Sequence, residues 1–411
     1  MILEKQYLLT ERAHLMCPQM NFGIAFTINA KFIKQKFHNV MNELESAHPF
    51  LKCRIGYEAE TNKYFYSYDE FLKVQVIEKS LAEIITENLP EDLWNDYNKT
   101  TSTDWNVLTD GLLQVFVYKA IEDFTILFVA HHLLADGRGL LELVQSFVDC
   151  YVEDKVPIFT EEKIISDITD LPVGSDLPFI SKIVIENANK KWRKEKKQLS
   201  YEEYHAFANR FVLENKKNYS LRKIEDEDFS KIIRQCHENK ITVNDYLLAK
   251  MAIEDQTDKI IMAFDIRNMI KNYVNGSLGN YATAVGILCK RKNKDMFSLA
   301  KSIHKKKESV IKNKSTLMTV LTCYMHMEPG LLDAAAITGL GIYESYSARF
   351  VGGQMFGFAN RNGYSITNLG KIHSDSIKDA VFIPPASPAV KKIWGVLTVN
   401  DTMNICSCEM V

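Results

Sequence analysis

The sequence has no excess of either charge. It carries 50 lysines and arginines against 52 aspartates and glutamates, a formal net charge of −2 at pH 7. Proteins that bind nucleic acids or membrane surfaces through general electrostatic attraction usually carry a basic excess. The balance therefore argues against both partners. The length of 411 residues with 46% hydrophobic residues predicts a globular protein large enough for two domains.

The sequence also has no Cys-x-x-Cys pair. Its eight cysteines are scattered, and only Cys406 and Cys408 lie close together. On a strand these two side chains would share a face, as metal ligands can, but no further His or Cys lies near them in the sequence. We therefore expect buried thiols and no metal site.

Two further features are missing. No apolar run is long enough to span a bilayer, and residues 1–10 are too short and too charged for an export signal. These absences predict a cytoplasmic protein with reduced thiols and no membrane span.

One stretch carries the residues best suited to catalysis, and it reads His131-His132-Leu133-Leu134-Ala135-Asp136-Gly137-Arg138-Gly139. The β-branched and aromatic run before it, residues 124–130, is typical of a buried strand, and residues 112–120 supply a matching strand. After the stretch, apolar residues recur at helical spacing up to Tyr151. The two histidines are thus expected at the end of a strand.

A histidine at a strand end is held by the sheet while its ring can face a cavity, and imidazole titrates near neutral pH, as a general base requires. Side chains alternate along a strand, so His131 and His132 should point to opposite faces and only one need be catalytic. Asp136 is expected to pair with an arginine, and Gly137 to let the chain bend into the helix. The chemistry alone leaves two alternatives, a metal pair and two buried histidines bonded to the backbone.

The pattern His-His-x-x-x-Asp-Gly after a hydrophobic strand resembles the signature of the chloramphenicol-acetyltransferase-like superfamily. That superfamily includes condensation domains of nonribosomal peptide synthetases, polyketide-associated acyltransferases, wax ester synthases and alcohol acyltransferases. Three other stretches resemble family segments in order and spacing. The first is residues 47–54, which include His48 and Pro49; the second is Asp265-Ile266-Arg267 together with Gly279-Asn280-Tyr281; the third is Thr367-Asn368-Leu369-Gly370. The resemblance therefore spans nearly the whole chain.

The resemblance implies an α+β fold in which two chloramphenicol-acetyltransferase-like halves form a V-shaped pseudo-dimer with a tunnel between them. We assign residues 1–153 to the N-terminal half with the motif, residues 154–204 to a crossover, and residues 205–411 to the C-terminal half. Within the last of these, residues 205–213 are expected to form a strand. Because two halves in one chain would already build the tunnel, we expect a monomer.

The resemblance also implies roles for the motif residues. His132 matches the second histidine of the family signature and would act as general base, while His131 and Gly137 would be structural. We expect Asp136 to form an ion pair with Arg267 rather than a catalytic pair with the histidine, because the family places an arginine there.

The tetrahedral oxyanion of acyl transfer needs hydrogen-bond donors. Backbone amides past the motif, such as that of Gly137, or the side chains of Asn280 and Asn368 could contact the oxyanion or the substrate.

The implied function is an acyltransferase that moves an acyl group from a thioester to an alcohol or amine. Acyl-coenzyme A is the simplest donor, because the chain has no apparent carrier domain or serine carrier motif; no tightly bound cofactor is expected. Two alternatives stay open. The donor could be a phosphopantetheinyl carrier protein, as it is for condensation domains, or the chain could be a non-catalytic relative that acts as a binding protein.

Overall fold

The computed structural model describes residues 5–17, 19–79, 91–102, 105–292, 294–338, 340, 343–355, 363–387 and 390–410. Within these residues the strands are β1 (Gln6–Tyr7), β2 (Asn21–Ile28), β3 (Cys53–Glu58), β4 (Lys63–Tyr68), β5 (Gln75–Lys79), β6 (Leu113–Lys119), β7 (Phe124–His131), β8 (Lys217–Ile224), β9 (Lys259–Asp265), β10 (Ala282–Leu288), β11 (Gly363–Ile372), β12 (Ile377–Ile383), β13 (Val390–Val399) and β14 (Thr402–Met410). The α-helices are α1 (Arg12–Leu15), α2 (Lys34–Ala47), α3 (Glu91–Ser102), α4 (Gly137–Glu153), α5 (Phe179–Glu195), α6 (Tyr201–Glu214), α7 (Asp226–Glu238), α8 (Val243–Glu254), α9 (Met296–Lys312), α10 (Lys314–Leu317), α11 (Thr319–His326), α12 (Pro329–Thr338) and α13 (Tyr346–Phe350).

The N-terminal half contains a five-stranded sheet in the order β12-β2-β7-β6-β5. On one face, Phe26 of β2 and Phe128 of β7 pack against Phe147 of α4. On the other face, Tyr97 of α3 lies so close to Gly23 that a Cβ there would be 3.0 Å from the ring. Because both faces are covered at interior packing density, the end of β7 is held rigidly.

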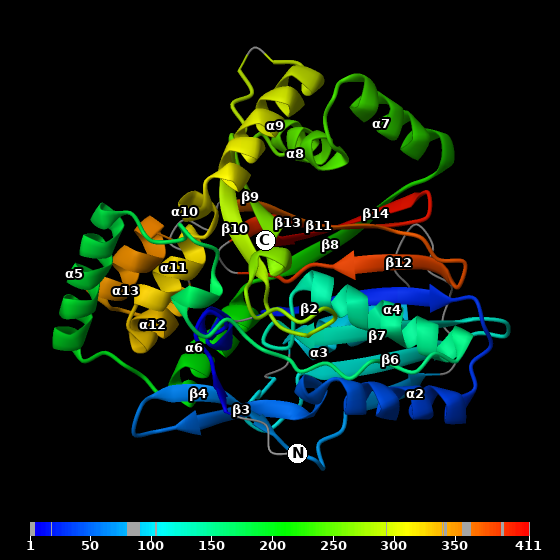
Figure 1. Ribbon diagram of the computed structural model, residues 1–411, viewed down its shortest axis with the longest axis horizontal. Coiled ribbons are helices and arrows are strands. Elements are labelled where there is room, and N and C mark those ends of the chain that lie inside the picture. Colours follow the sequence, from blue (N-terminus) through cyan, green and yellow to red (C-terminus); the bar gives the residue numbers. More distant parts are fainter. Residues whose placement is uncertain are drawn as a thin grey trace.

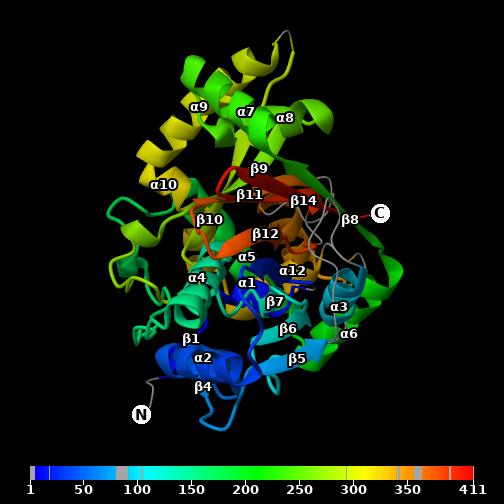
Figure 2. The same cartoon turned by 90° about the vertical axis from the view of Figure 1, so that its right-hand side faces the viewer.

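The C-terminal half contains a six-stranded sheet in the order β10-β9-β11-β13-β14-β8. Helices α7, α8 and α9 lie on its outer side, away from the N-terminal sheet (Figures 1 and 2). The buried side chains of Leu247, Leu299 and Trp394 belong to one hydrophobic core beneath these helices. The sheet thus forms a second lobe with a core of its own.

Strand β12 joins the two lobes. It follows β11 of the C-terminal sheet in the sequence, yet it pairs antiparallel with β2 of the N-terminal sheet, with Ala380 opposite Phe26. Both views place β12 between the two sheets (Figures 1 and 2). The C-terminal half therefore completes the sheet that carries the His-His motif.

The strand predicted at residues 205–213 is wrong, because these residues lie in helix α6. Ser200 and Glu203 form a capping box at its start, and Tyr204, Ala208 and Phe211 are buried along one face. Their spacing of four and three residues is that of a helix. The residues before it, placed in the crossover, include helix α5, which buries Trp192.

No helix in the described part of the chain has both the length and the apolar character needed to cross a membrane.

Candidate active site

The turn after β7 positions the motif. β7 ends at His131, and Asp136 caps helix α4 by accepting a hydrogen bond from the Gly139 N–H at 2.8 Å. A Cβ at Gly137 would lie 2.8 Å from Leu369 Cδ2 of β11. The glycine therefore allows the start of α4 to pack directly against the C-terminal sheet.

His132 is held by Asn280, which lies just before β10. Its Nδ1 lies 2.8 Å from Asn280 Oδ1, and Asn280 Nδ2 donates to the His132 carbonyl oxygen at 2.7 Å. A carbonyl oxygen can only accept, so the amide nitrogen must face it and the amide oxygen must face the ring. Nδ1 therefore carries the ring proton, and Nε2 of the neutral ring has a lone pair that no described residue uses.

Two other rings pack against His132. The His14 ring is stacked on it, with ring centroids 4.3 Å apart and an angle of 12° between the ring planes. The centroid of the Phe22 ring lies 5.1 Å from that of His132. Burial lowers the pKa of His132 below its ordinary value, an effect opposed by the Asn280 hydrogen bond and by the charge of Asp136. The ring is thus neutral at pH 7, in the state that accepts a proton.

Asp136 and Arg267 form the ion pair that the sequence predicts. Arg267 Nη2 lies 2.8 Å from Asp136 Oδ1, and both side chains are only 5% exposed. The second oxygen of Asp136 accepts a hydrogen bond from the Tyr281 N–H at 2.8 Å. Arg267 Nη1 donates to Asp265 Oδ2 at 2.9 Å. Asp136 therefore ties the motif turn to the segments after β9 and before β10, and its carboxylate has no hydrogen bond to His132.

His131 occupies the opposite side of the strand end. Its Nδ1 accepts the Leu133 N–H at 3.1 Å, which puts the ring proton on Nε2. Burial, with His132 as the next contribution, lowers the pKa of His131 to about 3. The ring therefore stays neutral over the whole physiological range.

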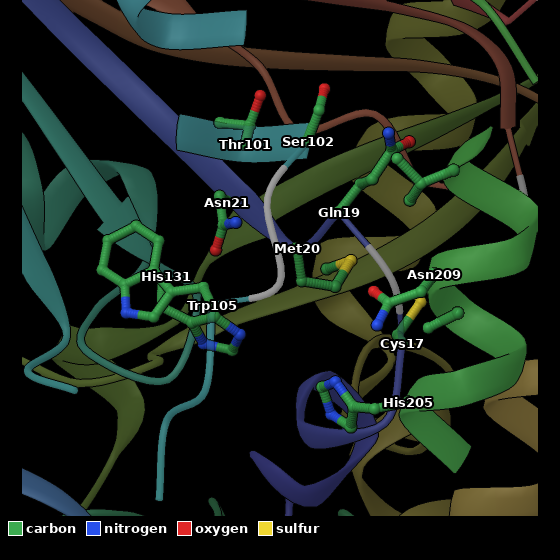
Figure 3. A pocket seen from close by; sticks show the side chains of 12 residues that line it. Cys17, Gln19, Met20, Asn21, Thr101, Ser102, Trp105, His131, His205 and Asn209 are labelled. Atoms are coloured by element: carbon green, nitrogen blue, oxygen red, sulfur yellow. The ribbon is translucent and has the colours of Figure 1, made fainter. Parts of the chain in front are cut away.

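His131 borders a small polar cavity of ≈ 40 Å³, room for about three water molecules. Figure 3 shows His131 and Asn21 on one side of it and His205 and Asn209 of α6 on the other. Asn21 Oδ1 is buried and has no hydrogen-bond partner among the described residues. Ordered water at such a site would satisfy it.

The asparagines predicted to contact the oxyanion or the substrate, and His48 in the segment that resembles the family, all have hydrogen-bond partners in the structure. Asn368 on β11 donates from Nδ2 to Asn244 Oδ1 at 3.2 Å and accepts the Gly370 N–H at 2.8 Å. Asn280 is engaged at both ends with His132. The ring of His48 pairs with the buried carboxylate of Glu162, with 3.2 Å between Nδ1 and Oε1. The two asparagines predicted to contact the oxyanion thus already serve as internal hydrogen-bonding groups.

Within the described residues no group of three His, Cys, Asp or Glu side chains is placed to hold a metal ion. All eight cysteines are buried and unpaired with one another. Burial raises the pKa of Cys408 to about 11. These thiols are therefore protonated and unreactive at neutral pH.

The sequence did not single out His14. It lies far from the motif in the chain, in a helix of four residues that shows no periodic pattern. A histidine in such a segment has no sequence signal that would connect it with the motif.

No protein-family model matches the sequence, and no curated protein matches it. Solved structures do match. The epimerization domain from the third module of tyrocidine synthetase B has a TM-score of 0.61 and 12% identity, covering 99% of this chain and 91% of that one. Trichothecene 15-O-acetyltransferase from Fusarium sporotrichioides has a TM-score of 0.62 and 10% identity, covering 98% and 90%. Polyketide synthase associated protein 5 from Mycobacterium tuberculosis has a TM-score of 0.59 and 12% identity, covering 100% and 93%.

These likenesses show the fold. The chain adopts the two-lobed α+β fold of these structures, and the fold class implied by the resemblance is therefore confirmed.

Proposed function

We propose that the protein is an acyltransferase that moves an acyl group from a thioester to an alcohol or amine, with His132 as general base. The observation that carries the proposal is the pair of hydrogen bonds between His132 and Asn280. It leaves the Nε2 lone pair free on a neutral ring, and a base of this kind can take a proton from a hydroxyl or amine.

The proposed reaction has two steps. In the first, His132 Nε2 takes the acceptor proton while the acceptor oxygen or nitrogen bonds to the thioester carbon, and the carbonyl electron pair moves onto oxygen. In the second, the carbonyl re-forms, the carbon–sulfur bond breaks, and the imidazolium returns its proton to the leaving thiolate. The products are an ester or amide and a free thiol, and the histidine is regenerated.

The oxyanion of the intermediate is expected to lie near the start of α4. The first N–H groups of a helix have no partner within the helix, and they carry partial positive charge. The amide of Gly137 is the first of them. We propose this N–H as a backbone donor to the oxyanion.

Acyl-coenzyme A is the proposed donor, and the protein is proposed to act as a monomer, with the substrates meeting in the tunnel that the resemblance implies. A second candidate donor is an acyl group on a phosphopantetheinyl carrier protein. It is favoured by the condensation domains among the similar structures, such as the first condensation domain of the calcium-dependent antibiotic synthetase, at a TM-score of 0.60.

The test is a thiol-release assay with acyl-coenzyme A of graded chain length and a panel of alcohols and amines. We expect His132→Ala to lower the rate about 10²–10⁴-fold, the contribution of a positioned general base. His237→Ala, at an exposed position on α7, is the matched control and should keep the wild-type rate. Near-wild-type turnover of His132→Ala would overturn the assignment. The same acyl group on a carrier protein, assayed in parallel, decides between the two donors.

A further inference from the structure

The segment that carries His14 is fixed to the rest of the protein by a buried ion pair. Arg12, two residues earlier, binds both carboxylate oxygens of Asp333 on α12 at 2.8 and 2.6 Å, and the two side chains are 3% and 2% exposed. Arg12 also donates to the Asn62 carbonyl oxygen at 2.6 Å. A bidentate arginine with a third bond has little rotational freedom, so α1 holds His14 in a defined place.

The ring of His14 lies flat against His132. With centroids 4.3 Å apart and planes 12° apart, the edges of the two rings are side by side. Both residues keep part of their surface exposed. A substrate that reaches the edge of one ring therefore also reaches the edge of the other.

His14 makes no hydrogen bond or ion pair from its side chain within the described part of the chain, and its ring is stacked on that of His132. Burial, followed by the neighbouring His132 and His131, lowers the pKa of His14 well below its ordinary value. At neutral pH the ring is thus uncharged and has one N–H to donate.

Neither asparagine predicted as a side-chain donor for the oxyanion is available for that role. Asn280 uses its amide to orient His132, and Asn368 is bonded to Asn244 and Gly370. We propose that His14 is that donor, and that its ring N–H binds the thioester carbonyl oxygen as this oxygen becomes negative. The inference rests on the proposed acyl transfer and adds a second catalytic residue to it.

The role follows from what a neutral imidazole offers. It donates one hydrogen bond without bringing a positive charge next to His132, whose basicity a neighbouring cation would reduce. A donor that is already in place costs no reorganisation when the oxyanion forms, and removing one such donor costs about 10²–10³ in kcat in known acyl-transfer sites.

The test compares two substitutions at position 14. His14→Phe keeps a flat ring for stacking but removes the donor, and we expect kcat to fall about 10²-fold with KM nearly unchanged. His14→Gln restores an N–H donor, and it should recover at least about a tenth of the wild-type kcat. His237→Phe is the control for the change of ring type, and the melting temperature is measured for every variant.

Two results would overturn the inference. One is His14→Phe with a kcat within threefold of wild type. The other is equal loss of activity in His14→Phe and His14→Gln, because that pattern indicates packing rather than hydrogen bonding. The failure of the proposed function looks different. A wild-type protein that transfers no acyl group, or a fully active His132→Ala, removes both proposals, whereas an active wild type with an unaffected His14→Phe removes only this one.

Discussion

Replacing Asp136 with alanine should destabilise the protein more than any change to an exposed ion pair. The carboxylate accepts three hydrogen bonds at 2.8 Å, from Arg267 and from the N–H groups of Gly139 and Tyr281. Loss of the helix cap costs about 1 kcal/mol, and an unpaired buried N–H costs about 1–3 kcal/mol. The buried guanidinium would keep Asp265 at 2.9 Å and Glu142 at 3.8 Å but lose its most buried partner, and we expect a total of about 3–5 kcal/mol in the free energy of unfolding.

Arg267→Ala should cost about 3 kcal/mol, because Asp136 would keep its two backbone donors but lose the ion pair with Arg267. The double mutant should lose less than the sum of the two single mutants by at least about 1 kcal/mol. Urea unfolding measured by circular dichroism gives these energies. Arg222→Ala is the matched control. It breaks a pair with Glu254 whose side chains are 43% and 36% exposed and a cation–π contact with Trp394, and it should cost less than about 2 kcal/mol.

The same variants should lose acyl-transfer activity, because the turn that aims His132 would loosen. Strictly additive energies for Asp136→Ala and Arg267→Ala, or a cost no greater than that of Arg222→Ala, would refute the claim that this ion pair holds the motif.

Three further predictions concern other positions. Asn280→Asp should raise the pKa of His132, because a carboxylate would face its Nδ1. The acid limb of the pH profile of kcat/KM should therefore move to higher pH. An acid limb at the wild-type pH would show that residue 280 does not control the pKa of the base. The pKa of His131 is about 3 in the folded protein, so below pH 6.5 the unfolded chain binds a proton at this residue and the folded protein does not. The free energy of unfolding should therefore decrease as the pH is lowered, by about 2 kcal/mol at pH 5. His131→Gln should reduce the pH dependence of stability between pH 6.5 and pH 5. An unchanged slope would show that His131 is not the group responsible. Gly395→Ala would put a Cβ 2.7 Å from the Phe382 carbonyl oxygen, and calorimetry should show a loss of about 1–3 kcal/mol; a melting temperature equal to wild type would mean that β12 can shift at no cost.

The motif region could be predicted from the sequence because its signals are local. The buried strand before His131 and the helix after Gly139 each have their own periodicity, and the structure has β7 and α4 there. The link from Asp136 to Arg267 came from the family resemblance, since no local pattern connects residues that lie 131 positions apart.

Other features depend on contacts that no local pattern encodes. Residues 205–213 contain Phe and Val side chains typical of a strand, but the capping box at Ser200 and packing against the N-terminal half make them helical. The position of β12 in the N-terminal sheet and the stacking of His14 on His132 follow from tertiary packing. The sequence therefore predicts neither, although both lie next to the motif residues.

The most direct test of the proposed acyl transfer is the ratio of free thiol to acylated acceptor formed in the reaction. The wild-type protein is incubated with acyl-coenzyme A and its best acceptor, and the free thiol and the acylated acceptor are both quantified by mass spectrometry. Acyl transfer by His132 predicts one ester or amide for each thiol released by the wild type, and neither product above the uncatalysed rate with His132→Gln. Equal product from His132→Gln, or thiol released without any acylated acceptor, would contradict the account.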